Sequence, residues 1–192
     1  PVACIKNGEG PTVLLMAGNH GDEYEGQIGH GVLLRTLEAQ DIQGRIIFLT
    51  SANFPAAMAG MRTSPIDEGN LNRSFPGDVN GGTTAQIAWY IEHVLLPQCD
   101  YVFDLHSGGS SLMYLPSALC RRQSDPTKMA QAIEILKLMG APAAYVADSP
   151  QGDDRTLTAA AGRQGVVHFG SELGGGGTLT PAALRVAIDG VR

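Results

Sequence analysis

Short apolar runs alternate with longer amphipathic stretches along this chain, and that alternation limits its possible folds more than any other feature. Five runs, rich in β-branched or aliphatic residues, are predicted to be strands: 12–17, 45–51, 101–105, 143–147 and 166–171. Most are apolar at consecutive positions, which is typical of strands buried on both faces. The predicted fold class is therefore α/β, with a mostly parallel or mixed central sheet and helices on both faces.

Helical periodicity marks the segments between these runs. Apolar residues that share one helical face are Leu33, Leu34 and Leu37; Ile87, Ile91, Val94 and Leu95; and Ala132, Ile133, Leu136 and Met139, with Gly140 as a stop. A last helix is predicted near the end of the chain, with Thr180 as its N-cap, Pro181 at its first position and Gly190 as its terminator.

Charge and cysteine content exclude several classes of protein. The net charge is −6, and the Lys and Arg residues are scattered, so a nucleic-acid partner is not expected. No apolar run approaches the roughly 20 residues that span a bilayer, so no membrane partner is expected either. The three cysteines, Cys4, Cys99 and Cys120, lie far apart without a Cys-x-x-Cys motif. This sparse set predicts reduced thiols and a cytoplasmic protein.

Polar residues follow the first of these strands at the point where it ends. The stretch GNHGDEYEG places His20 and Glu23 three positions apart, so both side chains can point to one side of a turn. An imidazole nitrogen and a carboxylate oxygen are zinc-type donors. Taken alone, however, the motif is better explained as a helix N-terminus at which Asp22, Glu23 and Glu25 complement the helix dipole.

A second histidine, His106, shifts this balance towards a metal site. It directly follows the strand 101–105 and precedes a serine and a glycine pair. It would add a third ligand from a separate strand end; three protein ligands, with a fourth position left to water, are the pattern of a catalytic zinc site. In α/β sheets, ligands gather beyond the carboxyl ends of the strands. Asp104 either orients a ligand or simply ends the strand, and both interpretations stay open.

Glu172 ends the strand 166–171, in the stretch VVHFGSELGGGG. A carboxylate at that point is well placed to act as a general base beside a metal-bound water. The alternative is an ordinary surface ion pair with a Lys or Arg. The other histidines are interpreted as structural: His30 and His93 lie on helices, and His168 lies within the strand.

The connection 52–82 is rich in Gly, Pro, Asn and Ser, and it carries Arg62, Asn72 and Arg73. A guanidinium beside an amide suits bidentate binding of a carboxylate. An arginine aimed at a carbonyl oxygen would stabilise the charge that develops there during acyl transfer. Each arginine could instead be a solvated surface residue, but the surroundings of Arg73 favour a functional role.

Four motifs in this order, GNHGDEYEG, NLNRSFPG, DLHSGG and SELGGGG, resemble the succinylglutamate desuccinylase/aspartoacylase family, which is related to the zinc carboxypeptidases. The resemblance runs from about residue 8 to residue 177. Around each motif the sequence is most similar to the N-acetyl-diaminobutyrate deacetylase branch of ectoine degradation. The resemblance implies that His20, Glu23 and His106 hold one zinc ion and that Glu172 is the base and proton shuttle.

The resemblance also implies a small-molecule substrate, an N-acyl amino acid whose amide bond is hydrolysed. Arg62 would polarise the acyl carbonyl, and Asn72 with Arg73 would receive the carboxylate of the substrate. If the substrate is N-acetyl-2,4-diaminobutyrate, its ammonium group could pair with Asp67 or Glu68. Three alternatives stay open: a zinc carboxypeptidase acting on peptide C-termini, an enzyme acting on another acyl chain, and a zinc-dependent binding module without catalysis.

Residues 1–192 are expected to form one zinc hydrolase catalytic domain. Family members commonly have residues ahead of this point and a C-terminal β-rich domain that closes over the pocket, so the chain is expected to be a fragment. The sequence does not reveal an oligomeric state, and a second copy of the chain is a candidate partner only because homo-oligomers are common among soluble enzymes.

Overall fold

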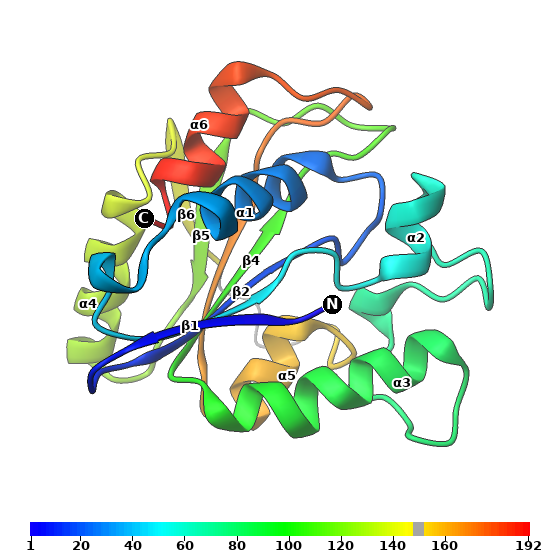
Figure 1. Ribbon diagram of the computed structural model, residues 1–192, viewed down its shortest axis with the longest axis horizontal. Helices are drawn as coiled ribbons and strands as arrows, with labels where there is room; N and C mark the ends of the chain where they lie inside the picture. Colours follow the sequence, from blue (N-terminus) through cyan, green and yellow to red (C-terminus); the bar gives the residue numbers. More distant parts are fainter. Residues whose placement is uncertain (148–151) are drawn as a thin grey trace.

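The computed structural model describes residues 1–147 and 152–192, and it shows a mixed sheet with helices on both faces (Figure 1). The described sheet has seven strands in the order β1-β3-β2-β4-β7-β5-β6. The strands are β1 (Ala3–Asn7), β2 (Thr12–Ala17), β3 (Gly44–Leu49), β4 (Tyr101–His106), β5 (Ser117–Arg121), β6 (Ala143–Ala147) and β7 (Val167–Glu172). The predicted α/β fold class is confirmed.

The centre of the sheet is parallel and its margins are not. Strands β3, β2, β4 and β7 all run in one direction. Strand β1 pairs antiparallel with β3, and β5 pairs antiparallel with β7 while running parallel to β6. The carboxyl ends of β2, β4 and β7 therefore meet at one edge of the sheet, which is where ligands bind in sheets of this kind.

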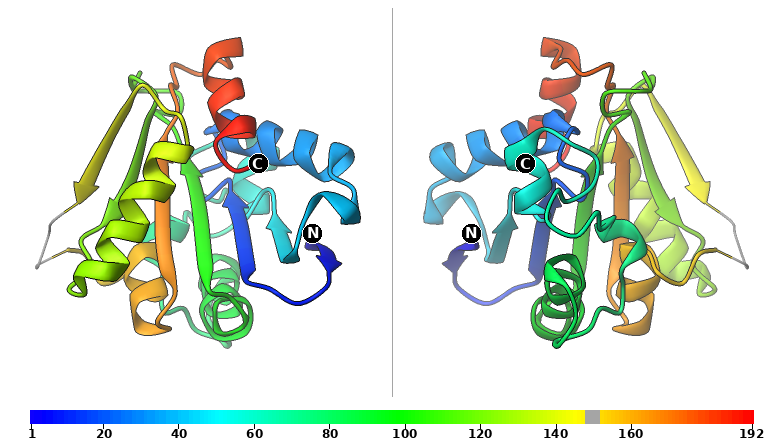
Figure 2. Two further views of the ribbon diagram at one scale, coloured as in Figure 1. Left: turned by 90° about the vertical axis from the view of Figure 1, so that its left-hand side faces the viewer. Right: turned by 90° about the vertical axis from the view of Figure 1, so that its right-hand side faces the viewer.

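Helices cover the two faces of the sheet in separate groups (Figure 2). The helices are α1 (Tyr24–Thr36), α2 (Phe54–Ala59), α3 (Thr83–Tyr90), α4 (Pro126–Leu138), α5 (Leu157–Arg163) and α6 (Pro181–Asp189). Short helical turns are η1 (Ala39–Asp41), η2 (Leu71–Arg73), η3 (Ile91–Leu95) and η4 (Leu96–Gln98). One face packs against α3, η3 and α5, and the other against α1, α4 and α6.

Strand β2 shows why its sequence is apolar at every position from Val13 to Ala17. Leu14 and Met16 point into the core beneath α3 and α5, whereas Leu15 and Ala17 point to the opposite face. All four side chains are almost fully buried. Burial of a side chain the size of leucine contributes about 1.5–3 kcal/mol, so both faces of this strand stabilise the sheet.

The predicted elements overlap those of the structure, with some differences. Strands β2 and β6 have the predicted bounds, whereas β1, β5, α2 and α5 were not predicted. In α4, the prediction that Ile133 faces the core is wrong, because its side chain is 38% exposed. Ile135 packs against the core instead, on the face of the helix that carries the buried Ala132, Leu136 and Met139.

The last helix begins and ends as predicted. The side chain of Thr180 accepts a hydrogen bond from the backbone N–H of Ala183, Pro181 is the first helical residue, and Gly190 closes the last turn. Among the described residues, no helix combines the length and apolar character that crossing a bilayer requires.

Candidate metal centre

The turn between β2 and α1 brings His20 and Glu23 together. Gly18 lets the chain leave the strand through a left-handed conformation, with a φ of 70°. Gly21 then passes so close to α2 that an added Cβ would lie 2.0 Å from the carbonyl carbon of Ala56. Glu23 is the N-cap residue of α1, and both candidate ligands are almost completely buried.

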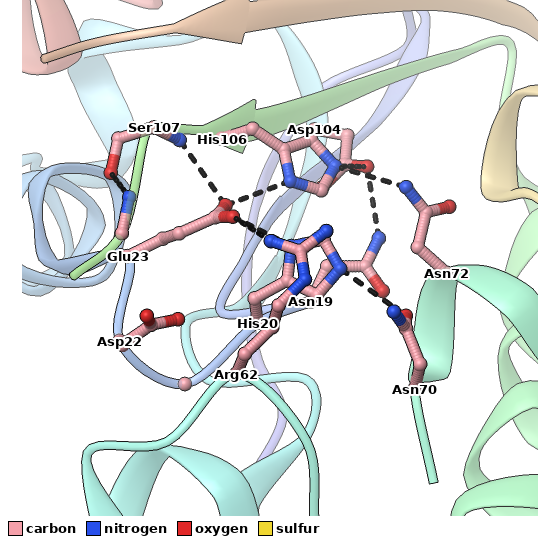
Figure 3. Close-up of polar contacts among 12 residues, drawn as sticks. Asn19, His20, Asp22, Glu23, Arg62, Asn70, Asn72, Asp104, His106 and Ser107 are labelled. Atoms are coloured by element: carbon pink, nitrogen blue, oxygen red, sulfur yellow. Dashed lines mark hydrogen bonds and ion pairs between the residues drawn. The ribbon is translucent and has the colours of Figure 1, made fainter. Parts of the chain in front are cut away.

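His106 reaches the same place from the end of β4. Its Nδ1 atom lies 2.8 Å from Oε2 of Glu23, and Nδ1 of His20 lies 2.6 Å from Oε1 of the same carboxylate (Figure 3). One possible donor atom from each of the three side chains lies within 4.8 Å of the other two. Residues that are 83 positions apart in the sequence thus form one cluster that could hold a metal ion.

The surroundings of this cluster fit a divalent cation. Nε2 of His106 contacts Oδ2 of Asp104 at 2.8 Å, and Nε2 of His20 contacts Oδ1 of Asn70 at 3.2 Å. A second group therefore holds each imidazole through Nε2, which leaves Nδ1 facing Glu23 as the donor atom. Two imidazole nitrogens and one carboxylate oxygen are a donor set that suits zinc. Asp104 thus orients a histidine instead of merely ending a strand.

Charges within the cluster favour an ionised Glu23. Burial by itself would raise the pKa of Glu23, but the charge of His106 and hydrogen bonds from both histidines outweigh it and lower the pKa to about 2. Burial likewise acts to lower the pKa of His106, yet the carboxylates of Asp104 and Glu23 raise it well above its usual range. The carboxylates around His106 therefore attract positive charge, which in the metal-free protein is a proton on the imidazole that a bound metal ion would displace.

Glu172 lies directly beside this cluster. It is paired in register with His106 across β4 and β7, so the two side chains start from neighbouring strand ends. Burial raises its pKa to about 7, against the opposing charge of His106 and with smaller contributions from Glu23 and Asp104. Within the described part of the chain, no ion pair joins Glu172 to a Lys or Arg, so the surface ion-pair interpretation is not supported.

The candidate residues of the 52–82 connection line the same cavity, which has a volume of about 260 Å³. Its walls are formed by His20, Glu23, Arg62, Asn72, Arg73, His106, Ser107, Gly108, Ser111, Leu112, Tyr114 and Glu172. The guanidinium of Arg62 approaches Oε1 of Glu23 at 3.4 Å while its side chain remains half exposed. All seven residues selected from the sequence therefore border one pocket.

Asn72 and Arg73 are held in place from the far side of the pocket. The side-chain oxygen of Asn72 accepts a hydrogen bond from the backbone N–H of Leu157 at 2.9 Å. Nε of Arg73 pairs with Oδ2 of Asp153 at 3.2 Å, and its Nη1 donates to the carbonyl of Asn72 at 2.6 Å. Asp153, before α5, and Leu157, the first residue of α5, thus hold both groups where they border the cavity.

Asp67 and Glu68 have other surroundings. The carboxylate of Asp67 accepts hydrogen bonds from both the backbone N–H and the hydroxyl of Thr84 at 2.7 Å, so it caps the start of α3. Glu68 is exposed and has a left-handed backbone, with a φ of 55°. Neither residue borders the cavity, and this weighs against their predicted pairing with a substrate ammonium group.

The remaining histidines lie outside the cluster, as predicted. His30 and His168 are buried, and burial lowers the pKa of each to about 4. His93 is exposed and stacks on Trp89, with ring centroids 5.2 Å apart.

Three residues of the site were not found from the sequence. Asn70 holds His20, Asn19 donates to Oδ2 of Asp104 at 3.0 Å, and the backbone N–H of Ser107 donates to Oε2 of Glu23 at 3.1 Å. Asn19 and Ser107 adjoin the two predicted histidine ligands in sequence, and Asn70 lies two positions before Asn72. Their closeness in the sequence to these candidate residues is the signal by which they could have been identified.

Comparison with known proteins identifies the family of this chain. The model of the succinylglutamate desuccinylase/aspartoacylase catalytic domain matches residues 9–192 of the chain. The chain belongs to the succinylglutamate desuccinylase/aspartoacylase family. This family member is 47% identical over 191 residues to the N-alpha-acetyl-L-2,4-diaminobutyric acid deacetylase of Halomonas elongata, covering all of this chain and 56% of that protein.

Solved structures of relatives have the same fold. The ectoine utilization protein EutE (DoeB) of Ruegeria pomeroyi, in its product-bound form, superposes with a TM-score of 0.93 at 41% identity. A succinylglutamate desuccinylase/aspartoacylase from Rhodobacter sphaeroides superposes with a TM-score of 0.92 at 39% identity. The match covers 100% of this family member in both cases, and 58% and 56% of those two chains respectively. This chain therefore spans somewhat more than half the length of the relatives it matches.

Proposed function

We propose that this family member hydrolyses the amide bond of a small N-acyl amino acid, with one zinc ion as cofactor and N-acetyl-L-2,4-diaminobutyrate as substrate. The observation that carries the proposal is the meeting of His20, Glu23 and His106 beside Glu172 in a single pocket. The name of the relative at 47% identity supports the choice of substrate. Reduced thiols at all three cysteines support a cytoplasmic location for the enzyme.

His20, Glu23 and His106 would hold the zinc ion, which supplies Lewis-acid polarisation of a carbonyl and a water that ionises near neutral pH. Glu172 is the proposed general base. Its carboxylate takes a proton from the attacking water and then passes that proton to the departing amine nitrogen. A pKa of about 7 suits both halves of this exchange, because the group can accept and release a proton near neutral pH.

The two arginines of the pocket have separate proposed tasks. Arg62, next to Glu23, would donate hydrogen bonds to the acyl oxygen as negative charge develops on it. Arg73 and Asn72, which also line the cavity, would bind the carboxylate of the amino acid and hold its amide bond over the cluster. Binding the remote carboxylate positions the reacting bond, which is an entropic contribution to the rate.

A substrate panel with the natural protein tests the proposal. N-acetyl-L-2,4-diaminobutyrate, N-acetyl-aspartate, N-succinyl-glutamate and an unblocked tripeptide are incubated with zinc-loaded protein, and release of free amine is measured. The highest kcat/KM is expected for N-acetyl-L-2,4-diaminobutyrate. Release of a C-terminal amino acid from the tripeptide alone would instead identify a carboxypeptidase, and no turnover of any compound would contradict the proposal.

The Glu172→Ala variant tests the assignment of the base on the preferred substrate. We expect kcat to fall by roughly 10²–10⁴-fold, the usual range for loss of a general acid–base group. Zinc content should remain that of the parent, since Glu172 is not one of the proposed ligands. Exposed Glu134, at 68% side-chain exposure, provides the matched Glu134→Ala control, which should keep full activity. A Glu172→Ala protein with the parental kcat would refute the assignment.

A further inference from the structure

Three acidic residues at the start of α1 are buried, although carboxylates normally stay in water. Asp22 is 4% exposed, Glu23 is 2% exposed and Glu25 is 1% exposed. A favourable helix dipole alone would leave such groups at the surface, and burying a carboxylate is costly unless hydrogen bonds compensate for the lost water. Glu23 belongs to the candidate metal cluster, so Asp22 and Glu25 require their own explanation.

Glu25 attaches a distant loop to the start of α1. Its Oε1 atom accepts a hydrogen bond of 2.9 Å from the backbone N–H of Gly175, which is 150 positions away. Gly175 lies in the β7–α6 loop, residues 173–180, which follows Glu172. The preceding residue, Gly174, has a φ of 116°, and a Cβ on it would lie 3.0 Å from Oε1 of Glu25. The loop therefore passes directly over the carboxylate.

Asp22 attaches the facing loop in a similar way. Its Oδ2 atom accepts hydrogen bonds from both the backbone N–H and the hydroxyl of Ser110, each 2.8 Å long. Ser110 lies in the β4–β5 loop, residues 107–116, which follows His106 and forms one wall of the pocket. The two buried acids on either side of Glu23 thus hold the two loops that leave β4 and β7.

These two loops are also joined to each other. The backbone N–H groups of Gly108 and Tyr114 donate to the carbonyl of Gly174 at 3.0 and 2.9 Å, and the N–H of Gly176 donates to the carbonyl of Leu112 at 2.8 Å. A Cβ on Gly175 would lie 2.3 Å from the Leu112 carbonyl oxygen, so the close approach of the two loops requires glycine there. The pair of loops behaves as one unit anchored on α1.

Glu172 depends on this unit for its position. Its Oε2 atom is buried and has no hydrogen-bond partner among the residues that the structure describes. The backbone that follows Glu172 is fixed at two points. The N–H of Leu173 donates to the carbonyl of His106 at 2.9 Å, and the N–H of Gly175 donates to Oε1 of Glu25. The placement of the carboxylate is thus determined by the backbone, and the contact with Glu25 lies three residues away.

We propose that Glu25 is a positioning residue for Glu172, which acts by holding the β7–α6 loop to α1. The inference rests on the proposed function, because it concerns the group assigned there as the base. Glu25 does not border the pocket, so it acts through the loop and not on the substrate. A displacement of about 1 Å in a reacting group can reduce the rate by roughly 100-fold, so loss of this contact should reduce turnover.

The Glu25→Ala variant of the natural protein tests the inference by two readouts. Amide hydrogen exchange should become faster in residues 173–177, a measurement that needs no substrate. With N-acetyl-L-2,4-diaminobutyrate, kcat should fall roughly 10- to 100-fold while KM changes less than about threefold, because Arg73 and Asn72 are untouched. Zinc content should remain that of the parent. Faster exchange with an unchanged kcat would overturn the positioning role and leave the proposed function intact.

Two further variants separate positioning from general destabilisation. Glu25→Gln keeps a side-chain oxygen for the N–H of Gly175, and it should recover most of the lost kcat and the slow exchange. Leu33→Ala removes a fully buried side chain from the same helix and should lower thermal stability with little effect on kcat. Equal losses of kcat in Glu25→Gln and Glu25→Ala would refute the inference, as would a similar loss in Leu33→Ala. Absence of turnover in the parent would refute the proposed function instead.

Discussion

Glu172 owes its chemical character to the strand end that it shares with His106. Burial raises its pKa from 4.5 to about 7, so the group is protonated at acidic pH in the metal-free protein. The proposed base must be ionised to act, and kcat should therefore fall about tenfold per pH unit below its pKa. A bound cation favours the carboxylate, so the midpoint should lie at or below pH 7. A kcat that stays constant from pH 8 down to about pH 4, below the ordinary pKa of 4.5 of a glutamate, would contradict this role.

Arg73 illustrates a binding residue that is remote from the proposed reacting bond. Its guanidinium is oriented by Asp153 and by the carbonyl of Asn72. For Arg73→Ala, we expect KM to rise by at least about tenfold with a smaller change in kcat, because the lost contact is present before and during the reaction. Arg185→Ala, at an exposed position of α6, is the control and should keep the parental KM. Steady-state kinetics decide the matter: an unchanged KM would exclude Arg73 from substrate binding.

Single residues could be predicted where chemistry coincides with a strand end. His106 and Glu172 both directly follow or end apolar runs, so their position at one edge of the sheet was readable from the sequence. The roles of Asn70 and of the N–H of Ser107 could not be predicted from the sequence. They depend on which atom of a histidine or carboxylate is left unpaired after folding. Which atom is left unpaired is determined by the folded structure and not by the local sequence.

At the level of elements, strong apolar runs were predicted well and weak ones were missed. Strand β2 is apolar at every position after Thr12, whereas β5, with the sequence SALCR, begins with serine and ends with arginine. Helix α5, with the sequence LTAAAGR, has small residues that pack closely but produce little periodic signal. Such elements exist because neighbours bury them, and a single sequence does not reveal those neighbours.

Helix α5 is anchored by an ion pair that makes a clear prediction for stability. Arg163 donates two hydrogen bonds, of 2.8 and 2.9 Å, to the carboxylate of Glu92, which is 2% exposed in η3. Removing the arginine leaves a buried charge unpaired, which typically costs about 3–5 kcal/mol, and partial exposure of Arg163 places the expected loss near the lower end. Urea unfolding of Arg163→Ala measures it, and a loss no larger than that of Arg185→Ala would contradict the prediction.

For the whole molecule, the direction of the central strands explains why the pocket exists. Because β2, β4 and β7 are parallel, their carboxyl ends bring residues from three distant segments to one edge. The 52–82 connection then supplies the cationic wall of the cavity. The predicted α/β class implied this arrangement of the central strands. The antiparallel margins of the sheet could not be predicted, because they are formed by β1 and β5, two strands that the sequence analysis did not identify.

Zinc titration of the metal-free protein tests the central claim most directly. Protein stripped with a chelator is mixed with increasing zinc, and hydrolysis of N-acetyl-L-2,4-diaminobutyrate is followed at each step. If His20, Glu23 and His106 form the metal centre, activity should be absent at the start, rise linearly and level off near one zinc per chain, and His106→Ala should show no such rise. Full activity in the stripped protein, or in His106→Ala without added metal, would contradict the account.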